Sequence, residues 1–297
     1  MLSIRRSAAS IFPLRLPFAT RVLIAASLVT AASVSGLAQD KPYEPIPGQA
    51  GKDAVWVPTP SATVEKMLDV AKVTPDDLII DLGSGDGRKV IAAARRGARA
   101  IGVEFEDKLV QLSRDLANKE GVADKASFVQ GDMFAYDFSQ ATVLPLFLLP
   151  QHFTRLMPKF LALQPGTRIV INTYRIPYWE PDEIVKVEDN CYRWCTVNLY
   201  IVPAQVEGTW RWDKGELTLK QDFQKISGTL SVDGKRVAIS DGRLRGDTIT
   251  FKVGGTRYTG RVDGNNVSGE MSGESNGKWT AARKEAPSGP GRAQTGG

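Results

Sequence analysis

Glycine and acidic residues follow two consecutive predicted strands with a spacing that suits a nucleoside cofactor. Residues 77–87 read Asp-Leu-Ile-Ile-Asp-Leu-Gly-Ser-Gly-Asp-Gly, and residues 102–106 read Gly-Val-Glu-Phe-Glu. The pattern predicts a strand, a glycine-rich turn that opens a helix, and a second strand that ends in an acid. Such turns bind cofactors at the carboxyl edge of a parallel sheet. A dinucleotide fingerprint would need a third glycine at position 88, which is Arg, so the pattern does not indicate a pyrophosphate cradle.

The glycines instead follow the pattern D-x-G-x-G-x-G, formed by Asp81, Gly83, Gly85 and Gly87. This pattern resembles the first motif of class I S-adenosylmethionine (SAM) methyltransferases. The resemblance implies that SAM is the cofactor, that the glycines allow close backbone approach, and that Asp81 orients the turn toward the methionine amine. It also implies that Glu104 accepts hydrogen bonds from both ribose hydroxyls at the end of the second strand.

The third predicted strand ends before Asp132, which the resemblance places against the adenine amino group, with Met133 against the ring. Each acid has a purely structural alternative, because Asp81 and Asp132 could cap helices and Glu104 could be a solvated strand end. Three acids at three successive strand ends favour the cofactor site over these alternatives.

A longer series of segments resembles the lysine methyltransferase family that includes the mitochondrial enzymes acting on the ATP synthase c-subunit, together with its bacterial relatives. The resemblance covers about residues 55–183, and it implies a protein lysine as the methyl acceptor. It rests on the segments Val57-Pro-Thr-Pro60, 81–88, Gly131-Asp-Met133, Ala141-Thr-Val143, Leu148-Leu-Pro150, Pro165-Gly-Thr-Arg168 and Trp179-Glu-Pro-Asp182.

The acceptor half of the site departs from that family. Related sequences commonly carry Tyr at the position of Phe147, and Ser-His-Asp where residues 171–173 read Ile-Asn-Thr. These positions end the fourth and fifth predicted strands, so Phe147 and Asn172 are candidates for the acceptor pocket. Thr59 is a third candidate. No residue is assigned as a catalytic base. His152, the only histidine, begins a predicted helix, where a surface or capping role is the ordinary one. Methyl transfer from a sulfonium needs no metal, and we expect no metal site.

Strand and helix patterns alternate through residues 56–203 and predict an α/β fold, a Rossmann-like seven-stranded methyltransferase domain with an antiparallel edge. Thr59 is expected to cap its first helix. The pattern changes after Pro203. Residues 204–284 contain about eight short alternating strands separated by glycine turns, which predicts a small all-β meander barrel, loosely similar to lipocalins and avidins. Trp210, Trp212 and Trp279 are interpreted as core and barrel-closing aromatics, with a ligand cage as the alternative.

The N-terminal 38 residues have the features of an export signal. They contain four Arg and no acid, an apolar run, and Gly36-Leu-Ala38 as a cleavage site. We expect an exported, periplasmic protein; a membrane anchor and a mitochondrial presequence are the alternatives, and membrane proximity stays open. Without this segment, 34 basic and 33 acidic residues remain, so no nucleic-acid partner is expected. Residues 39–55 are predicted to be a linker or wrapping arm, and residues 285–297 a disordered tail.

The two cysteines, Cys191 and Cys195, are predicted to be free thiols. The pattern places both on one strand that returns from a turn at Asp189-Asn190. Four residues along a strand span about 13 Å, which is too far for a disulfide.

Two functions from different classes follow from these observations. The leading hypothesis is a SAM-dependent methyltransferase that acts on protein lysines by direct displacement. The alternative is an exported, non-enzymatic protein that keeps the SAM-type fold and binds a ligand or partner, since SAM is made in the cytosol.

Overall fold

A computed structural model describes residues 43–213, 215–232 and 234–284. The expected signal segment 1–38 and the expected tail 285–297 lie outside these residues. Among the described residues, no helix is both long and apolar enough to cross a membrane.

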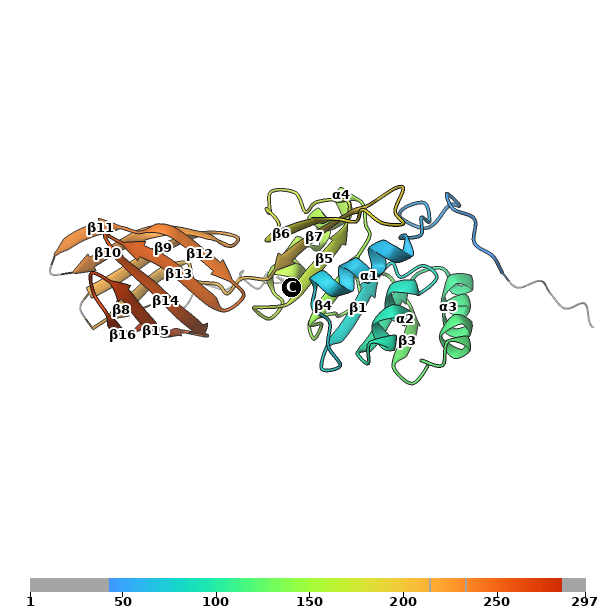
Figure 1. Ribbon diagram of the computed structural model, residues 1–297, viewed down its shortest axis with the longest axis horizontal. Helices are drawn as coiled ribbons and strands as arrows, with labels where there is room; N and C mark the ends of the chain where they lie inside the picture. The colour runs from blue at the N-terminus through green and yellow to red at the C-terminus, as the bar shows by residue number, and fades with distance from the viewer. Residues whose placement is uncertain (1–42, 214, 233, 285–297) are drawn as a thin grey trace, which may run out of the picture. The chain divides into compact units, whose positions relative to one another are not determined.

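The first part of the chain forms a seven-stranded mixed sheet with helices on both faces (Figure 1). The strand order is β3-β2-β1-β4-β5-β7-β6. β7 pairs antiparallel with both β5 and β6, and the other strand pairs are parallel. This is the predicted Rossmann-like fold. Its elements are α1 Ser61–Val70, β1 Leu78–Leu82, α2 Arg88–Arg95, β2 Arg99–Glu104, α3 Asp107–Lys119, β3 Ala126–Gln130, β4 Val143–Leu146, α4 Pro150–Leu161, β5 Arg168–Asn172, β6 Glu183–Lys186 and β7 Thr196–Ile201.

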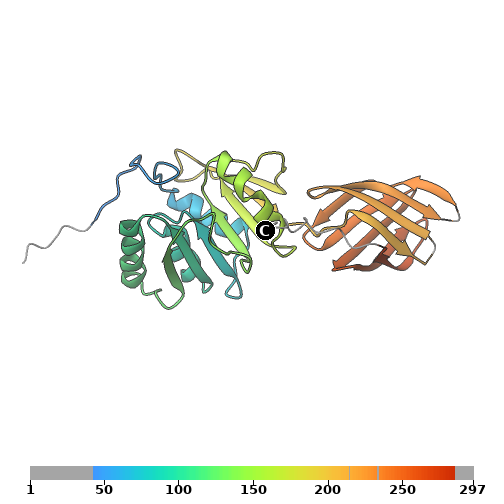
Figure 2. The ribbon, with the colours of Figure 1, turned by 180° about the vertical axis from the view of Figure 1, so that it is seen from behind.

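Two apolar cores flank the sheet because successive side chains of a strand point to opposite faces. In β1, Ile79 packs with α1, α2 and α3, whereas Ile80 and Leu82 pack with α4 on the other face. Figure 2 shows α4 from its own side of the sheet. The strand order reverses between β1 and β4, so a crevice opens at their carboxyl ends, where α/β proteins bind ligands.

The first helix begins later than expected. Pro60, not Thr59, occupies the N-cap position of α1, and no side chain caps the helix. The carbonyl oxygen of Thr59 instead accepts a hydrogen bond of 2.7 Å from Arg88, and the Thr59 side chain is buried. Because the Thr59 side chain does not cap the helix, it can contribute to the cavity described in the next section.

The prediction of two free thiols is wrong, because Cys191 and Cys195 form a disulfide with their Cα atoms 5.7 Å apart. The prediction failed because it started the strand after the Asp189-Asn190 turn too early. β7 begins only at Thr196, and the residues before it form a turn instead of an extended strand. Asn190 and Trp194 both have positive φ angles, 54° and 57°. The turn brings the two cysteines within bridging distance.

The second part of the chain is a closed antiparallel barrel. Eight strands form the ring β10-β12-β13-β14-β15-β16-β8-β9, which closes through the pairing of β9 with β10; β11 adds to the edge of β10. The predicted meeting of the first and last strands is confirmed, since Trp212 of β8 pairs with Ala281 of β16. The strands are β8 Gly208–Trp212, β9 Gly215–Asp222, β10 Lys225–Val232, β11 Lys235–Ala238, β12 Ser240–Arg245, β13 Thr248–Val253, β14 Thr256–Asp263, β15 Asn266–Gly273 and β16 Gly277–Arg283.

The barrel interior is filled by side chains. Trp210 and Trp279 are buried, and Trp279 packs edge-to-face on Phe251 and Tyr258. Trp212 is half-buried and contacts Tyr258 in the same way. The space among these rings has a volume of only about 10 Å³, roughly one water molecule. The tryptophans are therefore core aromatics and do not form a ligand cage.

We expect the two halves to be separable. The barrel has its own core, and none of the described residues after Trp194 lines the large cavity described below. A fragment of residues 39–203 should bind SAM like the full chain, and residues 204–284 should fold alone. Calorimetry and circular dichroism on the two fragments test this. A folded first fragment without SAM affinity, or an unfolded second fragment, would show that the boundary is misplaced.

Candidate functional site

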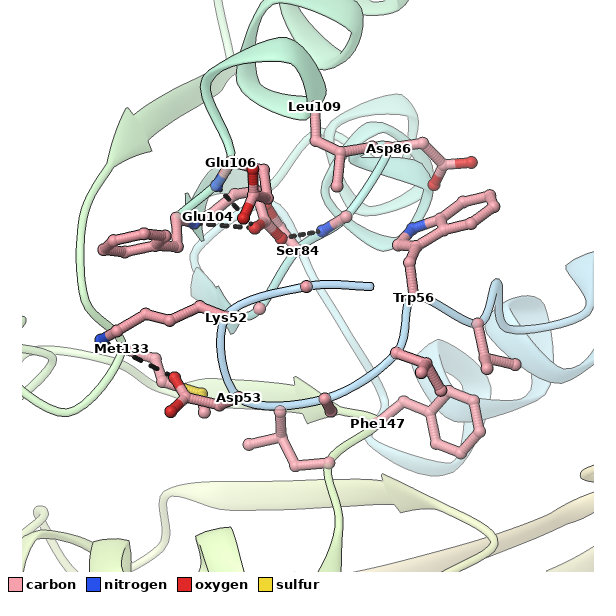
Figure 3. Close-up of a pocket in the computed structure, with 18 of the residues that line it drawn as sticks. Lys52, Asp53, Trp56, Ser84, Asp86, Glu104, Glu106, Leu109, Met133 and Phe147 are labelled. Atoms are coloured by element: carbon pink, nitrogen blue, oxygen red, sulfur yellow. Dashed lines mark hydrogen bonds and ion pairs between the residues drawn. The ribbon is translucent and has the colours of Figure 1, made fainter. Parts of the chain in front are cut away.

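One large cavity of about 380 Å³ lies at the carboxyl ends of β1 to β4. This volume lies within the range of small-molecule binding sites. Four groups of residues at the strand ends line one side of it: the glycine turn 83–86, the segment 103–106 after β2, the segment 131–133 after β3, and the segment 147–149 after β4. Residues 49–59, which precede α1, complete the wall (Figure 3).

The glycine turn contributes bare backbone to this wall. Gly83 and Gly85 line the cavity with positive φ angles of 70° and 58°. A Cβ atom on Gly85 would lie 2.6 Å from the indole nitrogen of Trp56, so a larger residue there would displace Trp56 and would also be strained by the positive φ angle. Gly87, the third glycine of the motif, is placed differently from Gly83 and Gly85. It does not line the cavity, and a Cβ there would lie 2.6 Å from Phe128, so this glycine lets α2 pack closely on the sheet.

Glu104 stands at the cavity wall as predicted, with its carboxylate held by backbone donors. The N–H of Gly85 donates to Oε2 at 2.8 Å, and the N–H groups of Phe105 and Glu106 donate to Oε1 at 2.7 and 3.0 Å. Three charge-assisted bonds fix the direction of the carboxylate. The end of β2 thus presents a positioned anionic acceptor to the cavity.

Asp132 and Met133 also line the cavity, on the segment after β3. Asp132 Oδ1 accepts from the backbone N–H of Phe134 at 2.8 Å, and Oδ2 accepts from Lys52 Nζ at 2.7 Å. The hydrogen bond from Lys52 holds the pKa of Asp132 below its ordinary value, and the Phe134 N–H adds to this effect. Lys52 belongs to the segment before α1, where sequence patterns gave no sign of a site residue.

Asp81 lies beneath the turn and not in the cavity wall. Its side chain is fully buried, and its partner is the equally buried Lys89 of α2, whose Nζ lies 3.1 Å from Oδ1. No backbone N–H of the described residues donates to it. Burial raises the pKa of Asp81 to about 7, while the charge of Lys89 acts in the opposite direction. Lys89 lines the cavity. The sequence did not predict this, because the helical periodicity indicates only that Lys89 lies on the buried face of its helix.

This shifted pKa makes stability depend on pH. The folded carboxyl keeps its proton up to about pH 7, whereas its ordinary pKa is 3.8, so between these values the folded state binds more protons. The contribution of Asp81 to the free energy of unfolding is therefore full below pH 3.8 and falls as pH rises toward 7, by up to about 1.4 kcal/mol per pH unit. We expect urea denaturation to show that the free energy of unfolding of wild type, relative to Asp81→Asn, decreases between about pH 5 and 7. Above about pH 7 the difference between the two proteins should stay constant. A constant difference between the two proteins would contradict the assignment.

Aromatic side chains form the wall at the carboxyl ends of β4 and β5. Phe147 stacks on Tyr174 with ring centroids 6.0 Å apart, and Trp194 packs on the same Phe147 ring at 5.9 Å. All three line the cavity, as does the buried Thr59. Asn172 does not; it is fully buried behind this wall, with its Oδ1 accepting from Thr173 Oγ1 at 2.9 Å. Of the three acceptor-pocket candidates, Thr59 and Phe147 line the cavity, and Asn172 does not.

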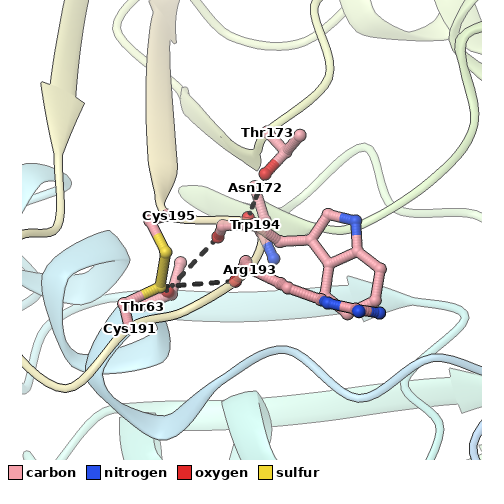
Figure 4. The surroundings of a disulfide bond; sticks show 7 residues. All are labelled: Thr63, Asn172, Thr173, Cys191, Arg193, Trp194 and Cys195. Atoms are coloured by element: carbon pink, nitrogen blue, oxygen red, sulfur yellow. Dashed lines mark hydrogen bonds between the residues drawn. A yellow bond between two sulfur atoms is a disulfide. The ribbon is translucent and has the colours of Figure 1, made fainter.

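The disulfide positions Trp194 at this wall. Trp194 directly precedes Cys195, and the bridge to Cys191 closes the turn that carries it (Figure 4). Thr63 of α1 anchors the same turn, because its Oγ1 lies 3.4 Å from both Cys191 Sγ and the carbonyl oxygen of Trp194. Sequence reasoning missed Trp194 because it treated the segment before β7 as strand.

His152 is buried and lines the cavity at the start of α4, contrary to the expected surface or capping role. It packs edge-to-face on Phe134, with ring centroids 5.9 Å apart. Burial lowers its pKa. The imidazole therefore contributes a neutral ring to the wall near neutral pH.

Comparison with known proteins identifies the family that shares these features. A family model, the ANTKMT methyltransferase domain, matches residues 81–183. A protein-lysine N-methyltransferase of Saccharolobus islandicus is 43% identical over 150 residues, which cover 50% of this chain and 92% of that protein. The ATP synthase c-subunit lysine N-methyltransferase of Xenopus laevis is 35% identical over 173 residues, 58% of this chain and 69% of that protein. The chain belongs to this methyltransferase family.

As a member of the family, the protein is a SAM-dependent methyltransferase, and the non-enzymatic alternative is not supported. The solved structure of an RNA methyltransferase from Salinibacter ruber in complex with S-adenosyl-L-homocysteine is also similar to this chain. It is 43% identical, covers 50% of this chain and 96% of its own, and has a TM-score of 0.47. The match of the family model ends before the barrel of this methyltransferase begins.

Proposed function

We propose that the protein transfers the methyl group of SAM to the side-chain amine of a lysine in an exported or periplasmic protein. The single observation that carries the proposal is one continuous cavity that joins acidic strand ends and a glycine turn to an aromatic wall. The names of the relatives from Saccharolobus islandicus and Xenopus laevis support lysine as the acceptor.

The residues of the cavity fit SAM. Glu104 would hold the ribose hydroxyls, since its carboxylate faces the cavity and is already oriented by backbone donors. Asp132 and Met133 would hold adenine, and the bare turn at Gly83 and Gly85 would hold the methionine part. Asp81 would act only indirectly, through its pair with Lys89 beneath that turn.

SAM supplies, when bound, an electrophilic methyl group on a sulfonium that is a good leaving group. The protein must therefore align a neutral amine and exclude water. Phe147, Tyr174 and Trp194 provide a wall that suits both tasks. Their faces attract an arriving ammonium group, and their apolar surroundings favour its neutral form once it is buried. No side chain of the wall is required as a general base.

The predicted export signal and the disulfide together support a location outside the cytosol. Disulfides persist in oxidising compartments and are rare in the cytosol of most organisms. We expect cleavage after Ala38, so N-terminal sequencing of the protein recovered from such a compartment should begin at Gln39. A full-length protein extracted from membranes would support an anchor instead.

The acceptor assignment is tested with SAM labelled on its methyl group. Purified protein is incubated with periplasmic extract, and the labelled products are hydrolysed and analysed for N-methyl-lysines. Wild type should place label in methylated lysine, and Glu104→Ala should lose it. Label in RNA, or in amino acids other than lysine, would overturn the proposed substrate while leaving the methyltransferase assignment intact.

A further inference from the structure

The ammonium group of Lys52 lies among the groups that the proposed function gives to adenine. Its Nζ donates to Asp132 Oδ2 at 2.7 Å and lies 4.6 Å from the centroid of the Phe105 ring. The remaining oxygen of Asp132 is held by the N–H of Phe134. Figure 3 labels Lys52 among the residues that line the cavity, and the hydrogen bond to Asp132 is made by the end of its side chain. An incoming adenine amino group would meet an acceptor that is already engaged.

The loop that carries Lys52 has a defined conformation. The N–H of Gly48 donates to the carbonyl oxygen of Trp56 at 2.8 Å, and the N–H of Trp56 donates to that of Gln49 at 2.9 Å. These bonds close residues 48–56 into a self-paired loop with Lys52 near its middle. The ring of Trp56, at the end of the loop, lies against Gly85 in the glycine turn. The loop therefore contacts the site at both the turn and the segment after β3.

The Lys52–Asp132 ion pair is partly exposed to solvent, so a ligand can replace Lys52 at Asp132 without a large loss of free energy. About a third of each side chain is exposed, 33% for Lys52 and 31% for Asp132. Ion pairs with such exposure contribute little to stability because water and salt screen them. Breaking this pair should consequently change a binding constant by only a small factor.

We propose that Lys52 is an internal competitor for the adenine subsite, so that cofactor binding replaces its ammonium at Asp132 by the adenine amino group. The proposal rests on the placement of adenine in the proposed function. After methyl transfer, return of Lys52 to Asp132 would assist the release of S-adenosylhomocysteine. The loop 48–56, which carries Lys52, would thereby set the affinity for the cofactor.

The test is the affinity of the intact mature protein for S-adenosylhomocysteine, measured by calorimetry on wild type, Lys52→Ala and Lys52→Gln. Both variants should bind roughly two- to fivefold more tightly, because the competitor is gone while the acceptor remains. Lys108→Ala is the matched control: Lys108 also lies over an aromatic ring, that of Tyr43 at 5.8 Å, and should leave the affinity unchanged.

A double-mutant cycle separates this proposal from the placement on which it rests. Asp132→Asn alone should bind more weakly than wild type, and Lys52→Ala should add no gain in that background. If Asp132→Asn weakens binding but Lys52→Ala leaves it equal or weaker, Lys52 covers the cofactor instead of competing, and the proposal is overturned. If Asp132→Asn has no effect, the adenine placement itself is wrong.

Discussion

Replacing Glu104 by alanine should weaken SAM binding by about 2–4 kcal/mol, roughly 30- to 800-fold. The N–H groups of Gly85, Phe105 and Glu106 hold the Glu104 carboxylate in place. Its oxygens can therefore accept hydrogen bonds from a ligand in the cavity without a change in the side-chain conformation. Two ribose hydroxyls would lose a charged acceptor together. Calorimetry with wild type and variant measures the difference.

Glu106→Gln is the matched control for this prediction. Glu106 also lines the cavity, two residues further along the chain, and only its backbone N–H contacts Glu104. Its neutral variant should bind SAM like wild type. Equal losses at both positions would indicate a general effect of charge, and no loss at Glu104 would remove the ribose assignment.

Breaking the Cys191–Cys195 disulfide should reduce methyl transfer by about 10- to 100-fold while SAM affinity stays unchanged. The bridge closes the turn that places Trp194 against Phe147, and neither cysteine lines the cavity. Loss of a five-residue covalent loop should also lower the free energy of unfolding by about 2 kcal/mol. The double variant Cys191→Ser/Cys195→Ser and the reduced wild type are compared in turnover and in calorimetry.

Two substitutions in the same loop distinguish positioning from general damage. Trp194→Ala should reproduce the loss of turnover with the disulfide intact. Tyr192→Ala should not, because the Tyr192 side chain is 97% exposed and does not line the cavity. Full activity of the disulfide-free protein would show that the turn holds Trp194 without the bridge.

The features predicted from sequence are those with local or periodic signals. A short apolar run before the glycine turn located β1 at Leu78–Leu82, and the spacing of glycines and acids placed Glu104 and Asp132 at neighbouring strand ends. Parallel sheets bring consecutive strand ends to one edge, so three local patterns were enough to assemble the cofactor half of the cavity.

The features that were missed depend on contacts between distant residues or on irregular backbone. Lys52 meets Asp132 across 80 positions of sequence, from a segment without periodicity. The disulfide was missed because positive φ angles at Asn190 and Trp194 convert an expected strand into a turn. Asn172 ends β5 as predicted, but burial behind the aromatic wall separates it from the cavity.

A crystal structure of the mature protein with S-adenosylhomocysteine tests the proposed cofactor site most directly. We predict that the ribose lies on Glu104, that adenine lies between Asp132 and Met133 with Lys52 displaced, and that the sulfur faces Phe147, Tyr174 and Trp194. A sulfur that faces away from these three rings, or a ligand bound outside the cavity, would contradict this prediction.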